Sequence, residues 1–392
     1  MISESDPVPR SAAKKLKHIR ELDGARGIAA LMVFFHHVGF STVHTDAWGP
    51  AVHWLKWIFV WGSSGVDLFF VLSGFLITSI LIETRPLRSY YADFYWKRIL
   101  RIQPLYVVCL LLVLLIYPHL WPGVVLSALF VVNFGAHFHI LMFGPFWSLA
   151  IEEQFYLVWP SVVRRRSVRQ IAYWSAAIAI ASMLIRVVGA YFGHHNYYYT
   201  FYKCDGLALG ALIACWFERR ALTQSSSQDG RNQQGSRLEN IVLNGCLASG
   251  VAMLVVSFSV IAPQYEYFVG ACFQTGVTLT AAGLIGRLVR DAGRWYLAPF
   301  RSRLLTFFGL ISYAFYLLHM FVLAAYDHVR PLPADGGDDR AYFVRLLTVL
   351  VLSTASALLT RYAIELPALS LRKHVLKAPS LPPVTAEPLD AL

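Results

Sequence analysis

Long apolar runs alternate along the chain with short polar segments that are rich in lysine and arginine. A helix needs about 20 predominantly apolar residues to cross the hydrocarbon core of a bilayer. Runs of about this length predict an all-α, polytopic transmembrane helix bundle of about ten spans. The predicted spans are residues 26–43, 65–82, 104–118, 146–163, 171–191, 203–217, 241–262, 267–288, 305–326 and 343–365.

Composition agrees with this pattern. Hydrophobic residues make up 57% of the sequence and charged residues only 15%, whereas a soluble chain carries about 25% charged residues. The net charge is +11, from 34 Lys and Arg against 23 Asp and Glu. The basic residues lie in short loops beside the apolar runs, which is typical of the positive-inside rule. We therefore predict contact with a lipid bilayer and no nucleic-acid partner.

The loop charges also assign the two sides of the membrane. Ten crossings place both termini and every basic loop in the cytoplasm, with the acid-rich segment 327–340 on the opposite side. An eleventh crossing at residues 121–134 would place the basic loop 164–169 outside. Residues 121–134 are therefore interpreted as a re-entrant or interfacial segment, which is tolerated where protein covers the backbone; the role of the whole segment 121–142 stays open.

The sequence predicts three regions. Residues 1–25 form a polar, basic cytoplasmic tail without the short apolar stretch and cleavage site of a removed signal peptide. Residues 26–376 form the membrane domain, in which the Gln-, Ser- and Gly-rich segment 219–239 is a disordered cytoplasmic linker. Residues 377–392, with four prolines, form a disordered tail. No soluble catalytic domain is expected, so any chemistry should occur inside the bundle.

The first span raises the question of function, because it carries two histidines that packing in lipid does not require. Arg26 and His37 are eleven residues apart, which places them about 20° from a common helix face and roughly 16 Å apart along the axis. His36 lies about 80° from that line. If one histidine shares a groove with Arg26, it is His37; the alternative is one interfacial and one packing histidine.

Two further spans carry acids. Asp67 follows glycines and serines at 62–65 that break a preceding helix. It is either a first-turn acid stabilised by the helix dipole, or an acid that orients a histidine or neutralises an arginine. Glu152 shares a helix face with Ser148 and Tyr156. The alternative, a solvated glutamate at the outer interface, is weakened by the apolar residues on both sides.

A basic cluster precedes the third span. Lys97, Arg98 and Arg101 lie on its predicted cytoplasmic side, and the two arginines are three residues apart, so they can face the same way. The cluster is either an anchor for anionic lipid headgroups or a guanidinium site for phosphates. Spacing alone favours the anchor.

Several weaker candidates could line an internal cavity. His319 lies in mid-span among aromatic residues, and Asp205 lies at the mouth of a span. Trp147, Ser148 and Tyr156 accompany Glu152. The cysteines have no metal-ligand spacing, so no metal site is predicted and they are interpreted as packing residues. They are Cys109, Cys204, Cys215, Cys246 and Cys272.

Taken together, these segments resemble the acyltransferase-3 family of integral-membrane O-acyltransferases. Six matching pieces run in the family's order and cover nearly the whole chain. They are LDGARGIAALMVFFHH (22–37), GVDLFFVLSGFLIT (65–78), KRILRIQP (97–104), WSLAIEEQFYLVWP (147–160), KCDGLALGALIA (203–214) and ISYAFYLLH (311–319).

The resemblance assigns family motifs to this sequence. The family has a motif in which a basic residue is followed by ten other residues and then a histidine. In this sequence the motif corresponds to Arg26 and His37. The family's arginine-rich stretch corresponds to Lys97, Arg98 and Arg101, with lysine at the first place, where arginine is commoner. This keeps the positive charge but loses a bidentate contact. The Trp–Ser–Leu–Glu segment corresponds to Trp147, Ser148, Leu149 and Glu152.

The resemblance implies transfer of an acyl group, often acetyl, from acyl-CoA as co-substrate to a hydroxyl of a sugar, a glycolipid or another cell-surface or exported acceptor. No permanently bound cofactor is implied, and the expected location is the bacterial inner membrane. His37 would be the general base, and Asp67 or Glu152 would orient its ring. Arg26 would stabilise charge on the donor.

Lys97, Arg98 and Arg101 would bind the nucleotide end of the donor from the cytoplasm. Two rival functions remain open on the sequence. One is a transporter or flippase for a glycan or lipid precursor, without covalent chemistry. The other is a catalytically silent relative that only binds sugar or lipid. The sequence leaves the acceptor, the acyl chain length and the oligomeric state open.

Overall fold

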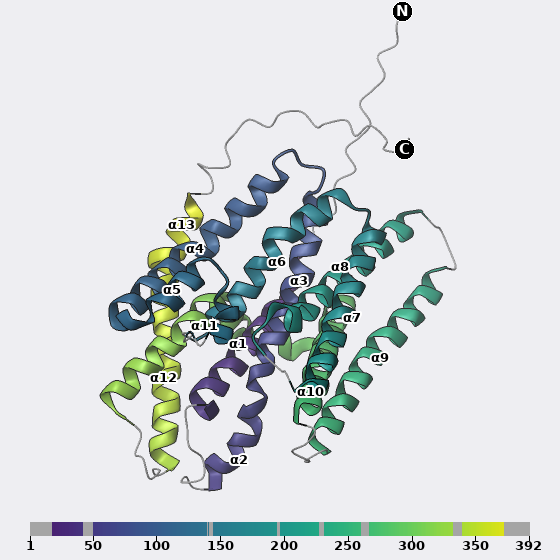
Figure 1. The fold of residues 1–392 in the computed structure, drawn as a ribbon. Helices are drawn as coiled ribbons and strands as arrows, with labels where there is room; N and C mark the ends of the chain where they lie inside the picture. Colours follow the sequence, from purple (N-terminus) through teal and green to yellow (C-terminus); the bar gives the residue numbers. More distant parts are fainter. Residues whose placement is uncertain are drawn as a thin grey trace, which may run out of the picture.

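The computed structural model describes residues 18–41, 50–138, 140, 144–193, 197–226, 231–259, 266–331 and 339–371. Within these ranges every regular element is a helix, and the long helices pack into a bundle (Figure 1). The predicted all-α class is confirmed for this part of the chain. The long helices are α1 (Arg20–His36), α3 (Ser64–Thr84), α4 (Tyr90–Ile116), α6 (Phe146–Arg165), α7 (Val168–Tyr191), α8 (Thr200–Ser226), α9 (Arg231–Ser259), α10 (Glu266–Arg290), α11 (Arg303–Val329) and α12 (Asp339–Thr360).

Short helical elements join the long helices. Three are α-helices, four are 3-10 segments and two are π-helical. They are α2 (Pro50–Phe59), α5 (Trp121–Ala128) and α13 (Leu366–Ser370); η3 (Val60–Ser63), η4 (Pro118–Leu120), η5 (Val132–Phe138) and η7 (Trp295–Arg301); and the π-helical η1 (His37–Ser41) and η8 (Arg361–Glu365).

Each predicted span overlaps one of the long helices. Seven stretches among the described residues are long and apolar enough to cross a membrane, and the long helices outside this group are α1, α6 and α8. These three carry charged residues within their length. Other helices pack against each of them: α3 and α11 against α1, α3 and α8 against α6, and α3 and α7 against α8. Such burial is how charged side chains are accommodated within a membrane protein.

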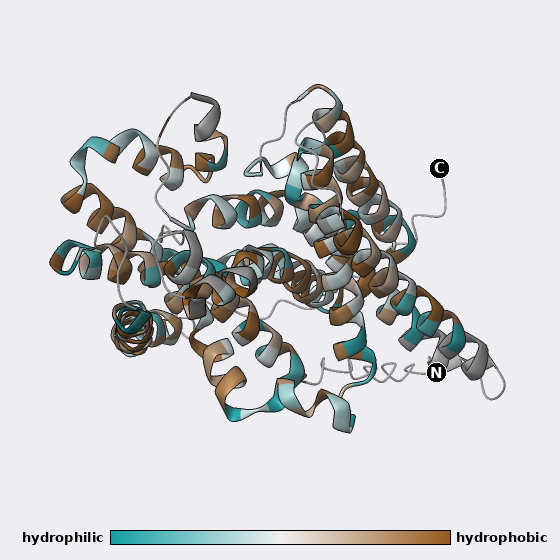
Figure 2. Ribbon diagram, turned by 90° about the horizontal axis from the view of Figure 1, so that it is seen from below, coloured by the Kyte–Doolittle hydropathy of each residue, from teal (hydrophilic) through white to brown (hydrophobic). Residues whose placement is uncertain are grey.

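The outer surface of the bundle is apolar. Leu115, Leu157 and Leu347 are more than half exposed, and hydrophobic residues extend along the bodies of the helices (Figure 2). A soluble monomer rarely exposes contiguous apolar surface on this scale. The surface is instead the one that lipid tails require, so the chain is an integral membrane protein.

Helices α3 and α6 run parallel, and this fixes the course of the chain between them. Ser73 contacts Tyr156, and farther along both helices the indole N–H of Trp159 donates to Thr78 at 2.8 Å. Parallel helices require an odd number of crossings between them. Since α4 is one crossing, the described part of the segment that contains α5 and η5 begins and ends on the same side of the bundle. This agrees with the prediction that residues 121–134 do not cross.

Helices α1 and α11 are in close contact because glycine removes the side chains between them. A Cβ on Gly27 would lie 2.0 Å from the carbonyl oxygen of Leu305, and a Cβ on Gly309 would lie 2.0 Å from that of Asp23. Small residues allow this approach between helices in membranes. Further along both helices, the ring centroids of Phe34 and Phe315 are 5.3 Å apart. The end of α1 therefore lies beside the middle of α11.

Two predicted regions differ from the structure or lie beyond it. Residues 219–226 belong to α8 and residues 231–239 to α9, so most of the expected disordered linker is helical. Residues 227–230, the first 17 residues and the predicted tail 377–392 lie outside the described residues. Helix α1 begins at Arg20, six residues before the predicted span, because polar residues can extend a helix beyond the hydrocarbon core.

Candidate functional site

A pair of histidines joins α1 to α11. The Nδ1 atom of His37 lies 2.8 Å from the Nε2 atom of His319, and the two rings are nearly parallel, with centroids 5.1 Å apart and 19° between their planes. His37 is partly buried, and His319 is 1% exposed. His37 begins the π-helical segment η1, and such wide turns are frequent at functional sites.

The hydrogen bonds around the pair assign its protons. The Nδ1 atom of His319 lies 2.8 Å from the carbonyl oxygen of Tyr316, which can only accept, so Nδ1 carries the hydrogen. In a neutral ring, Nε2 of His319 then accepts from Nδ1–H of His37. This assignment places the lone pair of His37 on Nε2, the nitrogen that is able to take a proton from a bound hydroxyl.

The acids expected to orient His37 have other partners. The described hydrogen bond of the His37 ring goes to His319, whereas Asp67 pairs with Lys203 and Glu152 accepts from Tyr156. Among the described contacts, therefore, neither acid that was predicted to orient His37 touches its ring, whereas His319 does. Asp67 is buried in the bundle, where a lysine offsets its charge.

His36 is placed differently from His37. Its Nδ1 lies 3.2 Å from the carbonyl oxygen of Phe59, at the end of α2. The helical geometry that separated the two histidines in the sequence therefore separates them in the structure, with one ring toward α11 and the other toward α2.

A second cluster contains the predicted arginines. Arg26 of α1 lies close enough to Arg98 of α4, and to Glu152 and Tyr156 of α6, for their charges to interact. The charge of Arg101 likewise interacts with those of Arg26 and Arg98. The structure thus brings together three of the predicted basic residues. Lys97 instead pairs with Asp93, at 3.8 Å and one turn away on its own helix.

Tyr156 is the centre of this cluster. The guanidinium carbon of Arg98 lies 3.4 Å from the centroid of its ring, a cation–π contact. Its hydroxyl donates to Oε2 of Glu152 at 3.1 Å and contacts the hydroxyl of Ser73. These contacts orient Arg98 while leaving hydrogen-bonding capacity unused. Among the described residues, the buried Nε of Arg98 and Oε1 of Glu153 have no hydrogen-bond partner.

Ser148 and Tyr316 connect the two clusters. The hydroxyl of Ser148 donates to the carbonyl oxygen of Pro145 at 2.9 Å, so the Tyr316 hydroxyl donates to Ser148, 2.5 Å away. Tyr316 also supplies the carbonyl that binds His319, and Ser148 lies one turn from Glu152 on α6. Helix α6, which carries Glu152 and Tyr156 of the arginine cluster, is therefore hydrogen-bonded to α11, which carries His319 of the histidine pair.

Trp147, which precedes Ser148 on α6, packs among aromatic side chains. Its ring packs edge-on against Tyr197 and Tyr198, with centroids 5.3 and 5.2 Å away. It also contacts Phe70 of α3. The predicted cavity residue Trp147 therefore packs between α3 and the segment before α8.

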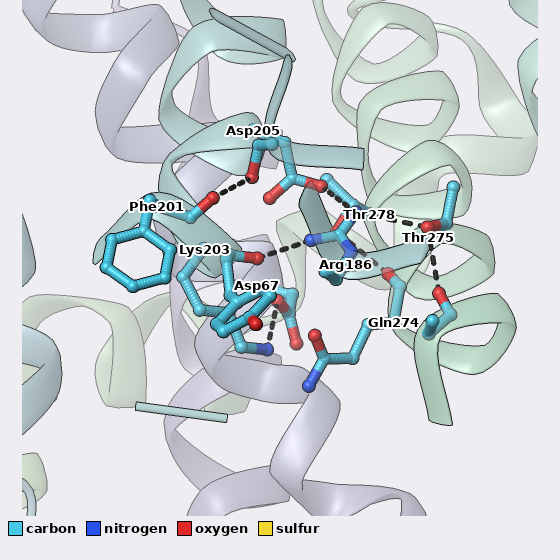
Figure 3. Close-up of polar contacts among 11 residues, drawn as sticks. Asp67, Arg186, Phe201, Lys203, Asp205, Gln274, Thr275 and Thr278 are labelled. Atoms are coloured by element: carbon cyan, nitrogen blue, oxygen red, sulfur yellow. Dashed lines mark hydrogen bonds and ion pairs between the residues drawn. The ribbon is translucent and has the colours of Figure 1, made fainter. Parts of the chain in front are cut away.

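A separate, fully buried network contains the remaining predicted residue, Asp205. Arg186 of α7 donates to Asp205 at 2.6 Å and to Thr275 of α10 at 3.1 Å. Lys203 donates to Asp67 at 2.8 Å, and Figure 3 shows the two ion pairs side by side. All four charged side chains are almost completely buried. This network ties α7, α8, α10 and α3 together.

Sequence reasoning missed Arg186 and Lys203. Arg186 interrupts an apolar run, the same signal that selected Asp67, and Lys203 lies two residues before Asp205. No group of three or more His, Cys, Asp or Glu residues in the described ranges has the arrangement of a metal site.

A family model described as an acyltransferase domain matches residues 19–362. YrhL of Bacillus subtilis, provisionally named a peptidoglycan O-acetyltransferase, is 29% identical over 77% of this chain and 48% of its own length. A Staphylococcus aureus protein, provisionally named an O-acetyltransferase, is 24% identical over 79% of this chain and 52% of its own length.

A shorter match is to OatA of Listeria monocytogenes, named a peptidoglycan O-acetyltransferase. It is 33% identical over 39% of this chain and 25% of its own length. The chain spans about half the length of these Bacillus subtilis and Staphylococcus aureus relatives. No solved structure matches it.

Proposed function

Since this chain belongs to the acyltransferase-3 family, as its sequence motifs predicted, we propose that it transfers an acyl group, in particular acetyl, from acyl-CoA to a hydroxyl of a cell-envelope carbohydrate. The names of the relatives support an O-acetyl product and a glycan acceptor. The observation that carries the proposal is the histidine pair, whose hydrogen bonds leave the lone pair of the His37 imidazole on Nε2.

In the proposed reaction His37 is the general base. Its Nε2 accepts the proton of the acceptor hydroxyl while the hydroxyl oxygen attacks the thioester carbonyl carbon. The carbon–sulfur bond then breaks, and coenzyme A leaves as a thiolate that takes the proton from Nε2 of His37, which returns the imidazole to its neutral form. His319 is a positioning residue, because it holds the Nδ1–H of His37 and so keeps Nε2 in the basic form.

The arginine cluster is proposed to bind the donor. Coenzyme A carries several phosphate charges, and guanidinium groups bind phosphate through charge-assisted hydrogen bonds. Arg26, Arg98 and Arg101 come from two helices and lie within electrostatic range of one another. The three arginines repel one another, and a bound anion would offset this repulsion together with Glu152. The unpaired Nε of Arg98 is a donor that such an anion would satisfy.

The proposed topology has ten crossings with both termini in the cytoplasm of a bacterial cell. From Gly27–Leu305 through Phe34–Phe315 to His37–His319, the contacts advance in the same direction along α1 and α11, so these helices are parallel. The ten-span order makes them the first and ninth crossings, which are parallel. The donor would then approach Arg26 from the cytoplasm, and the acceptor would reach His37 from the opposite side, about 16 Å farther along α1.

The proposal is tested by supplying purified protein with acetyl-CoA labelled in the acetyl group, together with muropeptides as the acceptor probe. Label that appears in an alkali-labile ester on the glycan, with equimolar release of free coenzyme A, supports an O-acyltransferase. Movement of a glycan precursor across proteoliposomes without consumption of acetyl-CoA would contradict the proposal and identify a transporter.

A further inference from the structure

The backbone immediately after His37 is held from outside its own helix. His37–Ser41 form the π-helical segment η1. Two side chains of α12 donate to carbonyl oxygens of this segment. Nη1 of Arg345 lies 2.5 Å from the carbonyl oxygen of Val38, and the Tyr342 hydroxyl lies 2.9 Å from that of Gly39. Both side chains are 1% exposed.

Arg345 also binds the helix that carries His319. Its Nε and Nη2 atoms donate to the two carboxylate oxygens of Asp327 on α11, at 2.8 and 2.7 Å. This is the planar, two-point contact that arginine makes and lysine cannot. One guanidinium therefore fixes the backbone beside His37 relative to α11, while His319 of the same helix fixes the ring of His37.

The contacts that Arg345 and Tyr342 make with this backbone are explained by the change from α-helix to π-helix at His37. Backbone carbonyls near the end of a helix lose their regular partners and need other donors. Solvent or lipid would leave the local geometry variable, whereas buried donors on a packed helix hold it in one arrangement. The position of His37 in the membrane bundle is thus determined from two directions, by α11 and by α12.

We propose that Arg345 and Tyr342 are positioning residues that hold His37 in its productive orientation, with Asp327 orienting Arg345; the inference rests on the proposed role of His37 as general base. The two residues touch neither the ring of His37 nor the arginine cluster among the described contacts. Their effect should therefore appear in kcat, with the KM for acetyl-CoA unchanged.

The most selective test is Tyr342→Phe, which removes one hydroxyl and keeps the ring. Its matched control is Tyr90→Phe, because Tyr90 is equally buried and its hydroxyl also donates to a backbone carbonyl, that of Pro160, at 2.9 Å. Purified variants are compared for kcat and for the KM of acetyl-CoA with muropeptides as acceptor. Thermal unfolding in detergent reports stability.

We expect kcat of Tyr342→Phe to fall about 10-fold, since displacement of a catalytic group by 1 Å costs up to about 100-fold. Tyr90→Phe should keep kcat within about twofold of the wild type, and the two phenylalanine variants should have equal thermal stability. Arg345→Lys should lower kcat further, because lysine cannot bind Asp327 and Val38 together. The inference is overturned if Tyr342→Phe matches the wild type, or if both phenylalanine variants lose the same fraction of kcat.

A second measurement does not depend on catalysis. Diethyl pyrocarbonate acylates neutral imidazole nitrogen, and mass spectrometry gives its rate of reaction with His37 in a His36→Gln background. Displacement of the ring in Tyr342→Phe should change this rate at least threefold; an unchanged rate contradicts the inference. If His37→Ala keeps wild-type turnover, the proposed role of His37 as general base fails instead, and the modification rate still decides whether Tyr342 positions the ring.

Discussion

The Nδ1 atom of His37 is hydrogen-bonded to the Nε2 atom of His319 at 2.8 Å, although 282 positions separate the two residues in the sequence. The bond closes a chain from the carbonyl of Tyr316 through both rings. In this chain the Nδ1 atom of each ring carries the proton. The partner on α11 therefore leaves Nε2 as the basic nitrogen of His37. A ring without this partner would be able to present either nitrogen.

Removal of His319 should therefore impair turnover more than donor binding. We predict that His319→Leu lowers kcat roughly 100-fold, the scale of a misplaced catalytic group, and leaves the KM for acetyl-CoA within about twofold. His319→Gln should recover part of the loss, because its amide oxygen can accept from His37. Steady-state kinetics with the exposed His119→Leu as control provides the check. Equal kcat in both leucine variants would show that His319 does not position His37.

Charge reversal in the arginine cluster should act on the donor. Arg98→Glu and Arg101→Glu are each expected to raise the KM for acetyl-CoA by at least about 10-fold, a loss equivalent to about 1.4 kcal/mol, with a smaller change for the acceptor. Arg165→Glu is the control, because Arg165 is exposed at the end of α6 and lies outside the cluster. A similar rise in all three variants would favour a membrane anchor over a donor site.

The buried ion pairs should matter for stability. Lys203→Met leaves Asp67 without its lysine partner in the bundle, and breaking a buried pair in this way costs about 3–5 kcal/mol. The double variant Lys203→Met/Asp67→Leu should recover a measurable part of the loss, since no unpaired charge remains. Unfolding in detergent, followed by tryptophan fluorescence, compares the variants. A double variant less stable than Lys203→Met would contradict this assignment.

Close packing of α1 on α11 should tolerate no added side chain. Gly27→Ala would place a methyl group 2.0 Å from the carbonyl oxygen of Leu305, so we expect a marked fall in thermal stability and in the yield of monodisperse protein. Gly245→Ala on α9 is the matched control, because a Cβ there meets nothing within 4 Å. Size-exclusion chromatography after purification distinguishes the two. Normal behaviour of Gly27→Ala would show that the helices are farther apart.

Much of the fold was predictable because lipid imposes a simple rule on sequence. Apolar runs located the long helices, and the positive-inside rule rejected a crossing at residues 121–134, in agreement with the parallel arrangement of α3 and α6. The segment 219–239 was predicted wrongly because its Gln, Ser and Gly content resembles a linker, whereas α8 and α9 extend beyond their apolar parts. Composition does not show where a helix ends once it has left the membrane.

The candidate site was predictable only in part, because pairing between helices is not a local property. Helical periodicity selected His37 over His36 and grouped Ser148, Glu152 and Tyr156 on one face of α6. It gave no means of pairing His37 with His319, or Asp67 with Lys203, since each pair depends on which helices become neighbours. Family motifs indicated the individual residues but not their contacts.

The central claim is that the His37 imidazole performs the proton transfer in acyl transfer. The most direct measurement is the rate of coenzyme A release from acetyl-CoA by purified His37→Ala and His36→Ala, with muropeptides as acceptor and tryptophan fluorescence as the check on folding. We predict that His37→Ala loses at least about 100-fold in kcat, the lower range for general base catalysis, while His36→Ala stays within a few-fold of the wild type. Turnover by folded His37→Ala at the rate of His36→Ala would contradict the mechanism.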